Sequence, residues 1–255
     1  MTGDYKDLAD FKEQCGYTID GAWYPRVTKI VTIKAKPALY YYYGQAKSFR
    51  AAQEATERSA QEGTLIHETV EAILLGRNPE VPPAIRPAVA AFADFYEHNR
   101  IQVSPEFVER RIVNQNHRYA GTVDAIARIG GKRGVLDIKT SQAIYRDYCL
   151  QTSAYMDALK DQFEDLETRW ILKIDQIQTC PRCGSRRRVK GGNESIKVAW
   201  QNGGRNCVHE WTDPRGDIEL QEFPFWQNDF EAFLGAKRLW EWENEGWLKQ
   251  ASYLS

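Results

Sequence analysis

The sequence predicts a mixed α/β (α+β) fold in which a central mixed sheet is flanked by helices. The main observation is a change of hydrophobic period. Apolar residues recur at helical spacing up to residue 100, alternate with a period near two over residues 107–141, and return to helical spacing from residue 147. The chain has 255 residues, of which 42% are hydrophobic and 12% aromatic. That is enough for a buried core without disulfides, in one or two domains.

The N-terminal part is expected to be largely helical after an irregular start. The first 20 residues lack strong periodicity, and residues 23–33 combine Pro25 with β-branched residues, which favours a short strand or an extended segment. Helices are expected from Pro37, over residues 47–61, from Gly63 to Gly76, and over residues 85–100 after the break NPEVPP.

Three consecutive antiparallel strands are expected next, at residues 107–115, 119–129 and 134–141, because Gly-containing turns separate these alternating runs. Further elements are a helix over 147–164, strands at 169–175 and 217–223, and an aromatic C-terminal helix from Phe230 to Trp247. The cysteine-bearing stretch between the last two strands has the character of an insertion at a hairpin tip. We therefore expect a main domain formed by residues 1–176 and 216–255, with residues 177–215 as a small metal-binding insertion.

Composition predicts a cytoplasmic protein without a membrane partner. The first residues, MTGDYKDLADFKEQ, are polar and acidic, unlike a secretory signal, and no apolar run approaches the ~20 residues of a membrane span. Five cysteines are an odd number, unlike a secreted disulfide scaffold. A reducing, intracellular compartment follows as the expectation.

Charge is distributed unevenly along the chain. The formal net charge is −1, but residues 177–215 carry eight basic and three acidic side chains, so this segment is +5 and the rest is −6. A basic patch on an acidic body favours a surface that faces a polyanion. A solvated loop explains the same charges equally well.

Two carboxylates and a lysine form the main chemical signal. If Gly130 and Gly131 make a two-residue hairpin turn, pairing back from the turn places Asp124 opposite Asp137. Opposed residues share one face of a sheet with Cβ atoms ~5 Å apart, and Lys139, two residues further on, shares that face.

Opposed carboxylates repel each other unless they share a proton or a cation. Hard divalent cations prefer carboxylate oxygens, and a nearby lysine can orient water, which together favour metal-assisted phosphodiester hydrolysis. The simpler interpretation is a surface ion pair between Asp137 and Lys139. The local pattern alone leaves both open.

The wider pattern resembles the RecB-like branch of the PD-(D/E)xK nuclease superfamily. The matching pieces, in the same order, are Gly63 to His67, Gly121 to Asp124, Asp137 to Ser141, and Gln151 with Tyr155. Upstream, Tyr24 to Thr28 and Lys36 to Leu39 resemble the phage-type and mitochondrial single-strand exonucleases of this branch. The resemblance covers about residues 22–175 and 217–243. Val123 departs from the pattern, since many members have Pro there.

The resemblance implies a restriction-endonuclease-like core and a role for each matching residue. Asp124 and Asp137 would be carboxylate ligands of the catalytic metal, joined by the Ile138 carbonyl and the His67 side chain. Lys139 would polarise the attacking water or hold the scissile phosphate.

Other residues would support the site or contact DNA: Gln151, Tyr155, Thr140, Ser141 and, as a further acid, Glu109. The metal would be magnesium or manganese, and imidazole in the ligand set favours manganese slightly.

The resemblance makes a metal-dependent DNA nuclease the expected function, as an exonuclease of replication, recombination or repair that acts on single strands or DNA ends. A recombination or replication protein is a possible partner. Two alternatives remain: a non-catalytic nucleic-acid-binding module on a nuclease-like scaffold, and a site-specific endonuclease.

The insertion carries its own candidate metal site. Cys180 and Cys183 form a CxxC knuckle, and Cys207 with His209 completes a Cys₃His set suited to zinc, although Gly204 stands where a zinc ribbon would have a further cysteine. A metal-free loop and a [4Fe–4S] cluster that includes Cys15 are the alternatives, the cluster ranking below zinc because the spacing differs. The neighbouring basic residues, expected as a phosphate-binding tip, are Arg186, Arg187, Arg188 and Lys190.

Overall fold

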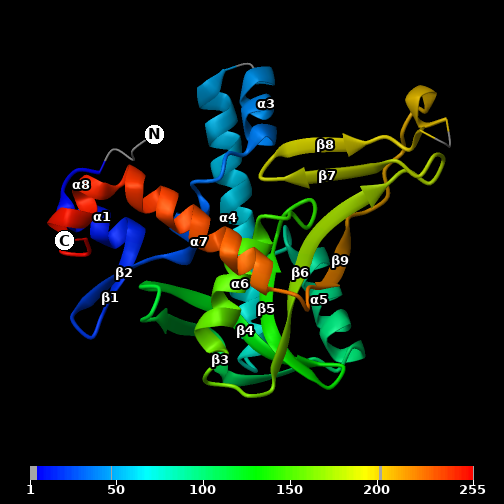
Figure 1. The fold of residues 1–255 in the computed structure, drawn as a ribbon. Coiled ribbons are helices and arrows are strands. Elements are labelled where there is room, and N and C mark those ends of the chain that lie inside the picture. The colour runs from blue at the N-terminus through cyan, green and yellow to red at the C-terminus, as the bar shows by residue number, and fades with distance from the viewer. Residues whose placement is uncertain (1–4, 47, 201–202, 255) are drawn as a thin grey trace.

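The structure is a computed structural model that describes residues 5–46, 48–200 and 203–254, and it confirms the mixed α/β class with a central mixed sheet flanked by helices (Figure 1). In chain order the elements are α1 (Leu8–Cys15), β1 (Gly16–Ile19), β2 (Ala22–Pro25), α2 (Val27–Val31), α3 (Pro37–Gln45), α4 (Phe49–Leu74), α5 (Arg86–His98), β3 (Gln102–Asn114), β4 (Tyr119–Ile129), β5 (Lys132–Lys139), α6 (Tyr148–Leu159), β6 (Leu166–Thr179), β7 (Arg186–Lys190), β8 (Asn193–Lys197), the 3₁₀ turn η2 (Gly204–Asn206), β9 (Arg215–Glu222), α7 (Gln227–Glu243) and α8 (Glu245–Gln250).

The central sheet has the strand order β3-β4-β5-β6-β7-β8, in which β7 and β8 form an antiparallel hairpin, and β9 also pairs with β6. The pairs β3–β4, β4–β5 and β6–β9 are antiparallel, whereas β5 and β6 are parallel. The connection between β5 and β6 contains α6, as a parallel crossover requires. Strand β6 is long enough to pair with β9 up to Ile177 and then with β7 at Gln178 and Thr179.

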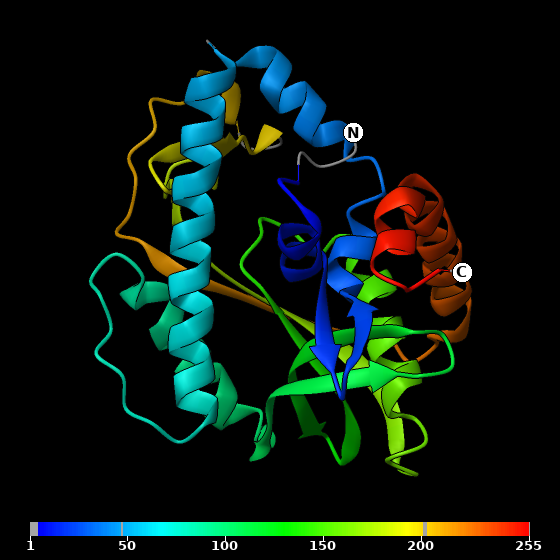
Figure 2. The same ribbon diagram turned by 90° about the vertical axis from the view of Figure 1, so that its left-hand side faces the viewer.

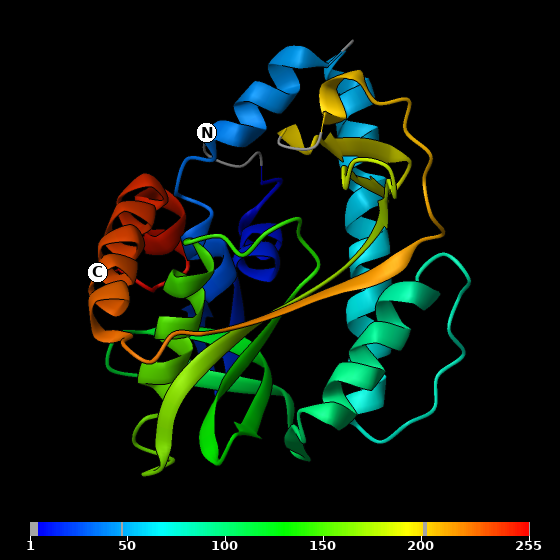
Figure 3. The same ribbon diagram turned by 90° about the vertical axis from the view of Figure 1, so that its right-hand side faces the viewer.

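Helices cover both faces of this sheet, and each face has its own hydrophobic core. On one face α4 and α5 pack over β-strand residues that include Leu136 and Trp170. On the other face α1, α2, α6 and α7 pack around Tyr119, Val123 and Tyr155. Figures 2 and 3 show α4 and α5 on one side of the sheet and α7 on the other. The buried middle of the sheet is thus shielded on both faces.

The register of the β4–β5 hairpin agrees with the sequence prediction. Gly130 and Gly131 both have positive φ values, 58° and 87°, as a tight turn of this kind needs. Pairing then runs from Ile129 with Lys132 back to Ala125 with Leu136. The next positions along the two strands are Asp124 and Asp137.

The prediction of two separate helices around Gly63 was wrong, because α4 runs without a break from Phe49 to Leu74. Gly63 has a packing role. A Cβ at this position would lie 2.5 Å from Thr140 Oγ1 and 3.1 Å from Lys190 Nζ, so only a glycine lets these groups approach the helix. The helix ends where predicted, with Gly76 in a left-handed conformation at φ 73°.

The N-terminal region is more regular than the sequence predicted. Helix α1 is short, but Asp7 caps it and Phe11 and Cys15, four residues apart, are buried. The short strand predicted within residues 23–33 is present at the start of that range as β2, but residues 27–31 form α2, because Val27 and Ile30 at helical spacing fill the core. Tertiary packing here outweighs the β propensity of the branched residues.

The C-terminal helix is interrupted. Instead of one helix from Phe230 to Trp247, α7 and α8 meet at Asn244, whose side-chain amide donates to the Trp240 carbonyl at 2.8 Å. A local side-chain bond of this kind competes with the helical backbone pattern.

Within the described ranges, none of the helices combines the length and the apolar character needed to cross a membrane.

The close packing at Gly63 leads to a stability prediction. Gly63→Ala should lower the free energy of unfolding by about 1 kcal/mol, since overpacking costs ~1–3 kcal/mol and replacing a helix glycine returns ~0.5–1 kcal/mol. Gly235→Ala is the matched control, because Gly235 lies in α7 with open space where its Cβ would be. It should raise stability by about 0.5–1 kcal/mol. Denaturant unfolding of both variants checks this, and equal shifts would contradict the tight packing.

Candidate functional site

The strands β4 and β5 separate at the candidate site. Backbone pairing stops at Ala125 and Leu136, and the next free amide, that of Ile138, donates to Asp124 Oδ2 at 2.6 Å. The Asp124 side chain therefore replaces a backbone carbonyl as the acceptor. This fork holds the Asp124 carboxylate between the two strands.

His67, Glu109 and Asp124 form a cluster around this fork. One potential ligand atom from each lies within 4.8 Å of the other two, and His67 Nε2 is 3.2 Å from Asp124 Oδ2. His67 comes from α4, Glu109 from β3 and Asp124 from β4. An imidazole nitrogen and two carboxylates at this spacing could hold a divalent cation.

The pKa values in this cluster reflect its crowded charges. The hydrogen bond to Asp124 raises the pKa of His67. Burial opposes ionisation of Asp124, but the hydrogen bond from His67 and the charge of Lys139 keep its pKa below the usual value. Desolvation of its carboxyl, and then the charge of Asp124, raise the pKa of Glu109 to about 7.

Asp137 lies beside this cluster in a second group of polar side chains. Its Oδ2 is 2.6 Å from Lys139 Nζ, and its Oδ1 accepts a hydrogen bond from Gln151 Nε2 at 2.9 Å. Gln151 also donates to the Tyr155 hydroxyl at 3.0 Å. The Asp137 side chain is 1% exposed and that of Lys139 is 19% exposed, so the lysine lies on the solvent side.

Burial, opposed by the charge of Lys139 and reinforced by that of Asp124, raises the pKa of Asp137 to about 6. For Lys139, burial is outweighed by the charges of Asp137 and Asp124, which raise its pKa. Lys139 is therefore an ammonium ion at neutral pH. In that form it can attract a phosphate or hydrogen-bond to water.

Of the two roles predicted for Tyr155, support of the site or contact with DNA, its position favours support of the site. Tyr155 is 1% exposed, and its ring packs on Gly121, where a Cβ would lie 2.6 Å from the Tyr155 ring. The buried Tyr155 hydroxyl thus holds the Gln151 side chain by accepting its hydrogen bond. The same packing explains why the Gly-Thr-x-Asp segment begins with glycine.

Glu109, predicted as a further acid of the site, is part of the cluster. Its backbone conformation is unusual. Its φ is 49°, in the left-handed region that a glutamate in a strand rarely adopts. Such backbone strain costs ~1–3 kcal/mol and concentrates at functional sites. No sequence pattern signals it, because strand alternation continues on both sides.

Sequence reasoning missed Tyr148. Its ring lies 5.2 Å from Lys139 Nζ, close enough for a cation–π contact. Tyr148 precedes Gln151 by three residues in α6, and this helical spacing on one face was the available signal.

Of the predicted tip residues only Arg186 is exposed, and the other predicted DNA-binding residues make contacts within the molecule. The Ser141 hydroxyl donates to the Ala143 carbonyl at 2.7 Å. Arg186 pairs with Asp217 and Arg187 with Glu194, each at 2.6 Å. The expected tip residues Arg188 and Lys190 are turned into the body, where both donate to the Thr140 carbonyl.

The insertion brings Cys180, Cys183, Cys207 and His209 together, with ligand atoms within 4.8 Å of one another. Cys180 Sγ lies 3.8 Å from Cys207 Sγ, and Cys183 Sγ lies 3.4 Å from His209 Nδ1. Bond lengths of ~2.3 Å to sulfur and ~2.0 Å to nitrogen around a tetrahedral zinc give separations of about 3.8 and 3.5 Å. The cluster could therefore hold a metal ion such as zinc.

The cluster lowers the pKa of the Cys180 and Cys183 thiols, whereas burial raises that of Cys207 to about 11. Burial opposes ionisation of Cys180, but the hydrogen bond from His209 and backbone amides lower the pKa of its thiol to about 6. The thiolate is the form that binds metals. Cys15 is not part of the cluster within the described residues and contacts the Tyr5 hydroxyl at 3.0 Å in the core.

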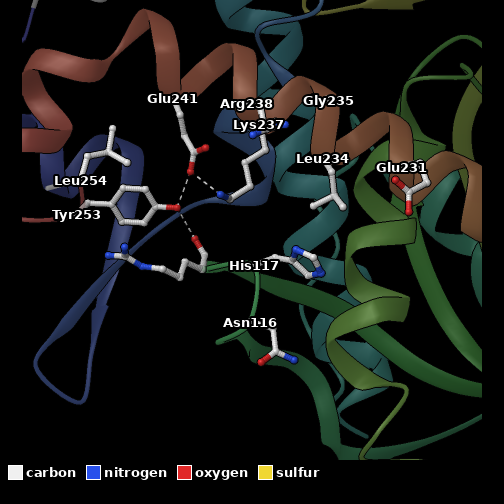
Figure 4. A pocket seen from close by; sticks show the side chains of 11 residues that line it. Asn116, His117, Glu231, Leu234, Gly235, Lys237, Arg238, Glu241, Tyr253 and Leu254 are labelled. Atoms are coloured by element: carbon white, nitrogen blue, oxygen red, sulfur yellow. Dashed lines mark hydrogen bonds and ion pairs between the residues drawn. The ribbon is translucent and has the colours of Figure 1, made fainter.

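The residues that line one surface hollow belong to neither of the two clusters. Its volume is about 570 Å³, and α7, the β3–β4 turn and the C-terminal segment line it (Figure 4). Tyr253 donates to Glu241 at 2.7 Å and also contacts the Arg118 carbonyl at 2.9 Å, while Lys237 pairs with Glu241. These polar groups are satisfied by one another and link the C-terminal segment to α7.

No family model matches the chain, and no curated protein matches it. Sixteen chains of solved structures match. One of them, described as the crystal structure of SSO0001, is 15% identical with a TM-score of 0.40, over 86% of this chain and 75% of that chain. A likeness at this level does not bear on function.

The strained backbone of Glu109 leads to a second prediction. In buffer without added divalent metal, Glu109→Gly should raise the free energy of unfolding by about 1 kcal/mol, because glycine adopts positive φ without strain. Glu106→Gly is the control on the same strand, where φ is not positive. It should lower stability by roughly 0.5–1 kcal/mol. Denaturant titrations of both variants test this, and destabilisation by Glu109→Gly would mean that its backbone is not strained.

Proposed function

We propose that this protein is a metal-dependent DNA nuclease that hydrolyses phosphodiester bonds. The observation that carries the proposal is the fork between β4 and β5, where the cluster of His67, Glu109 and Asp124 adjoins the Asp137–Lys139 pair. The resemblance of the motifs to RecB-like nucleases agrees with this arrangement and favours an exonuclease acting on single strands or DNA ends.

The donor set fits a hard divalent cation. His67 and Asp124, with Glu109, would hold Mg²⁺ or Mn²⁺, and Asp137 is the adjacent carboxylate predicted as a further ligand. When bound, such an ion activates water and stabilises negative charge on a reacting phosphate. The role predicted for the Ile138 carbonyl stays a prediction, since the contact described here is made by its amide.

The chain's own residues supply positioning and charge. Lys139, held as an ammonium by Asp137, would orient water or the scissile phosphate through its exposed side. Gln151 fixes the Asp137 carboxylate by donating to Oδ1, so that Oδ2 stays directed at Lys139. Tyr155 in turn holds the Gln151 side chain.

This assignment predicts the effect of three substitutions. Asp124→Ala, Asp137→Ala and Lys139→Ala should each reduce cleavage by at least about a hundredfold, since each removes charge that acts on the reacting groups. Glu68→Gln is the control, because Glu68 is an exposed carboxylate next to His67 on α4 and lies outside the cluster. The assay follows end-labelled single- and double-stranded DNA with Mg²⁺ or Mn²⁺, and with EDTA.

Cleavage by wild-type protein that resists EDTA, or near-normal cleavage by any of the three variants, would contradict the assignment. Absence of cleavage by wild-type protein on every substrate would favour a non-catalytic nucleic-acid-binding module on the same scaffold.

We also propose that the Cys₃His cluster holds a structural zinc ion. The tetrahedral spacing of its donors supports zinc, and the separate place of Cys15 in the core disfavours an iron–sulfur cluster that includes it. Structural zinc contributes directly to folding free energy.

Metal content tests this second proposal. Purified wild-type protein should contain one zinc per chain, and Cys207→Ser should lose most of it because a thiolate ligand is removed. Cys149→Ala is the matched control, since Cys149 is a buried free thiol outside the cluster, and it should keep the zinc. Elemental analysis gives the answer. Iron in place of zinc, or no metal, would overturn the assignment.

A further inference from the structure

We propose that the β7–β8 hairpin braces the candidate catalytic site, and that Arg188 and Lys190 are positioning residues that act on Lys139 through Thr140. The inference rests on the proposed nuclease function for its catalytic consequence. Its structural part stands on contacts between three elements: the hairpin, the end of β5 and α4. Figure 1 shows β7 and β8 extending from the end of β6 toward α4.

The first contact is at the end of β5. This strand ends at Lys139, and the carbonyl of the next residue, Thr140, accepts hydrogen bonds from Arg188 Nη2 at 3.2 Å and from Lys190 Nζ. Two cations thus hold the peptide that follows Lys139. A partly buried carbonyl still needs hydrogen-bond partners once strand pairing has ended.

The second contact joins the hairpin turn to α4. Ser59 donates to the Lys190 carbonyl at 2.9 Å, and Arg58 donates to the Gly191 carbonyl at 3.1 Å. In return the Gly191 amide donates to Glu62 at 2.8 Å. The tip of the hairpin is therefore fixed to one turn of α4 by three hydrogen bonds.

The third contact connects the hairpin and the end of β5 to the part of α4 that carries His67. Gly63, which touches Thr140 and Lys190, precedes His67 by four residues, so the two lie on the same face of α4. The hairpin, the end of β5 and α4 meet at this junction. It lies one helical turn from His67 and one residue from Lys139.

The base of the hairpin is held by the Cys₃His cluster. Cys180 directly follows β6, and its amide donates to the Ser185 carbonyl at 2.8 Å, just before β7 begins. Arg188, in the middle of β7, pairs with Asp175 of β6, whose side chain is 4% exposed. Metal bound at the base would thus fix the direction in which β7 delivers Lys190 to the junction.

The charges of the hairpin are used within the molecule. Lys190 is 5% exposed, and the Arg188 side chain is 15% exposed. Arg186 and Arg187 each form an ion pair with an acidic side chain of the insertion or of β9. A brace accounts for the contacts of Arg188 and Lys190, whereas the side chain of Arg186 is 43% exposed despite its ion pair.

The test compares Lys190→Met with Lys197→Met. Both remove one positive charge from the hairpin, but Lys197 is exposed on β8 and makes none of the junction contacts described above. Lys190→Met should lower kcat by about tenfold with KM for a single-stranded oligonucleotide nearly unchanged, as loss of a supporting contact does. Lys197→Met should leave both constants unchanged.

Hydrogen exchange gives a readout that does not depend on catalysis. In Lys190→Met, backbone amides of residues 139–142 should exchange about tenfold faster than in wild-type protein, and those of β4 should be unaffected. If Lys190→Met lacks a folded state, wild-type protein stripped of metal and reloaded with Mn²⁺ alone takes its place. It should show the same faster exchange, reversed by one equivalent of Zn²⁺.

The outcomes separate the brace from the proposed function. Unchanged exchange and unchanged kcat in Lys190→Met would overturn the brace, and an equal rise in KM for both variants would make the hairpin a phosphate-binding surface instead. If wild-type protein cleaves no DNA yet exchange responds as expected, the brace stands and the nuclease assignment fails.

Discussion

The site depends on one hydrogen bond, from the Ile138 amide to the Asp124 carboxylate. Where β4 and β5 would normally continue their ladder, a side chain accepts the amide, and the strands separate around a buried charge. The rest of the site follows from this replacement of a backbone acceptor by the Asp124 carboxylate. His67 can reach Asp124 from α4, and Asp137 turns to Gln151 and Lys139. In a continued ladder the Ile138 amide would donate to a backbone carbonyl, and the Asp124 carboxylate would lack this donor.

The two candidate metal sites differ in how their donors are held. The Cys₃His donors lie on one short stretch of chain, so a bound ion would organise local structure. The donors near Asp124 come from three elements that the hydrophobic cores fix in place, so that site is formed by the fold. Zinc would therefore act on folding of the insertion, whereas Mg²⁺ or Mn²⁺ would enter a preformed set of oxygens and one nitrogen.

Local patterns predicted the sheet and its register, because alternation and the Gly130–Gly131 turn depend on neighbouring residues only. The Cys₃His set was also predictable, since its donors lie close in sequence. The continuous α4 was not, because the reason for Gly63 lies on Thr140 and Lys190, far along the chain. The orientation of the basic hairpin was missed for the same reason. Charge in a sequence predicts exposure, but here acidic partners on β6, β8 and β9 neutralise it.

Because α4 is unbroken, the packing of Gly63 against Thr140 and Lys190 fixes the direction in which His67 points toward Asp124. Each residue of an α-helix turns the chain by about 100°, so one residue inserted between Gly63 and His67 would swing the imidazole away from Asp124 while the hairpin stayed docked. An insertion before Arg58 or after Leu74 would leave this direction unchanged. The four-residue interval is thus a fixed dimension of the molecule.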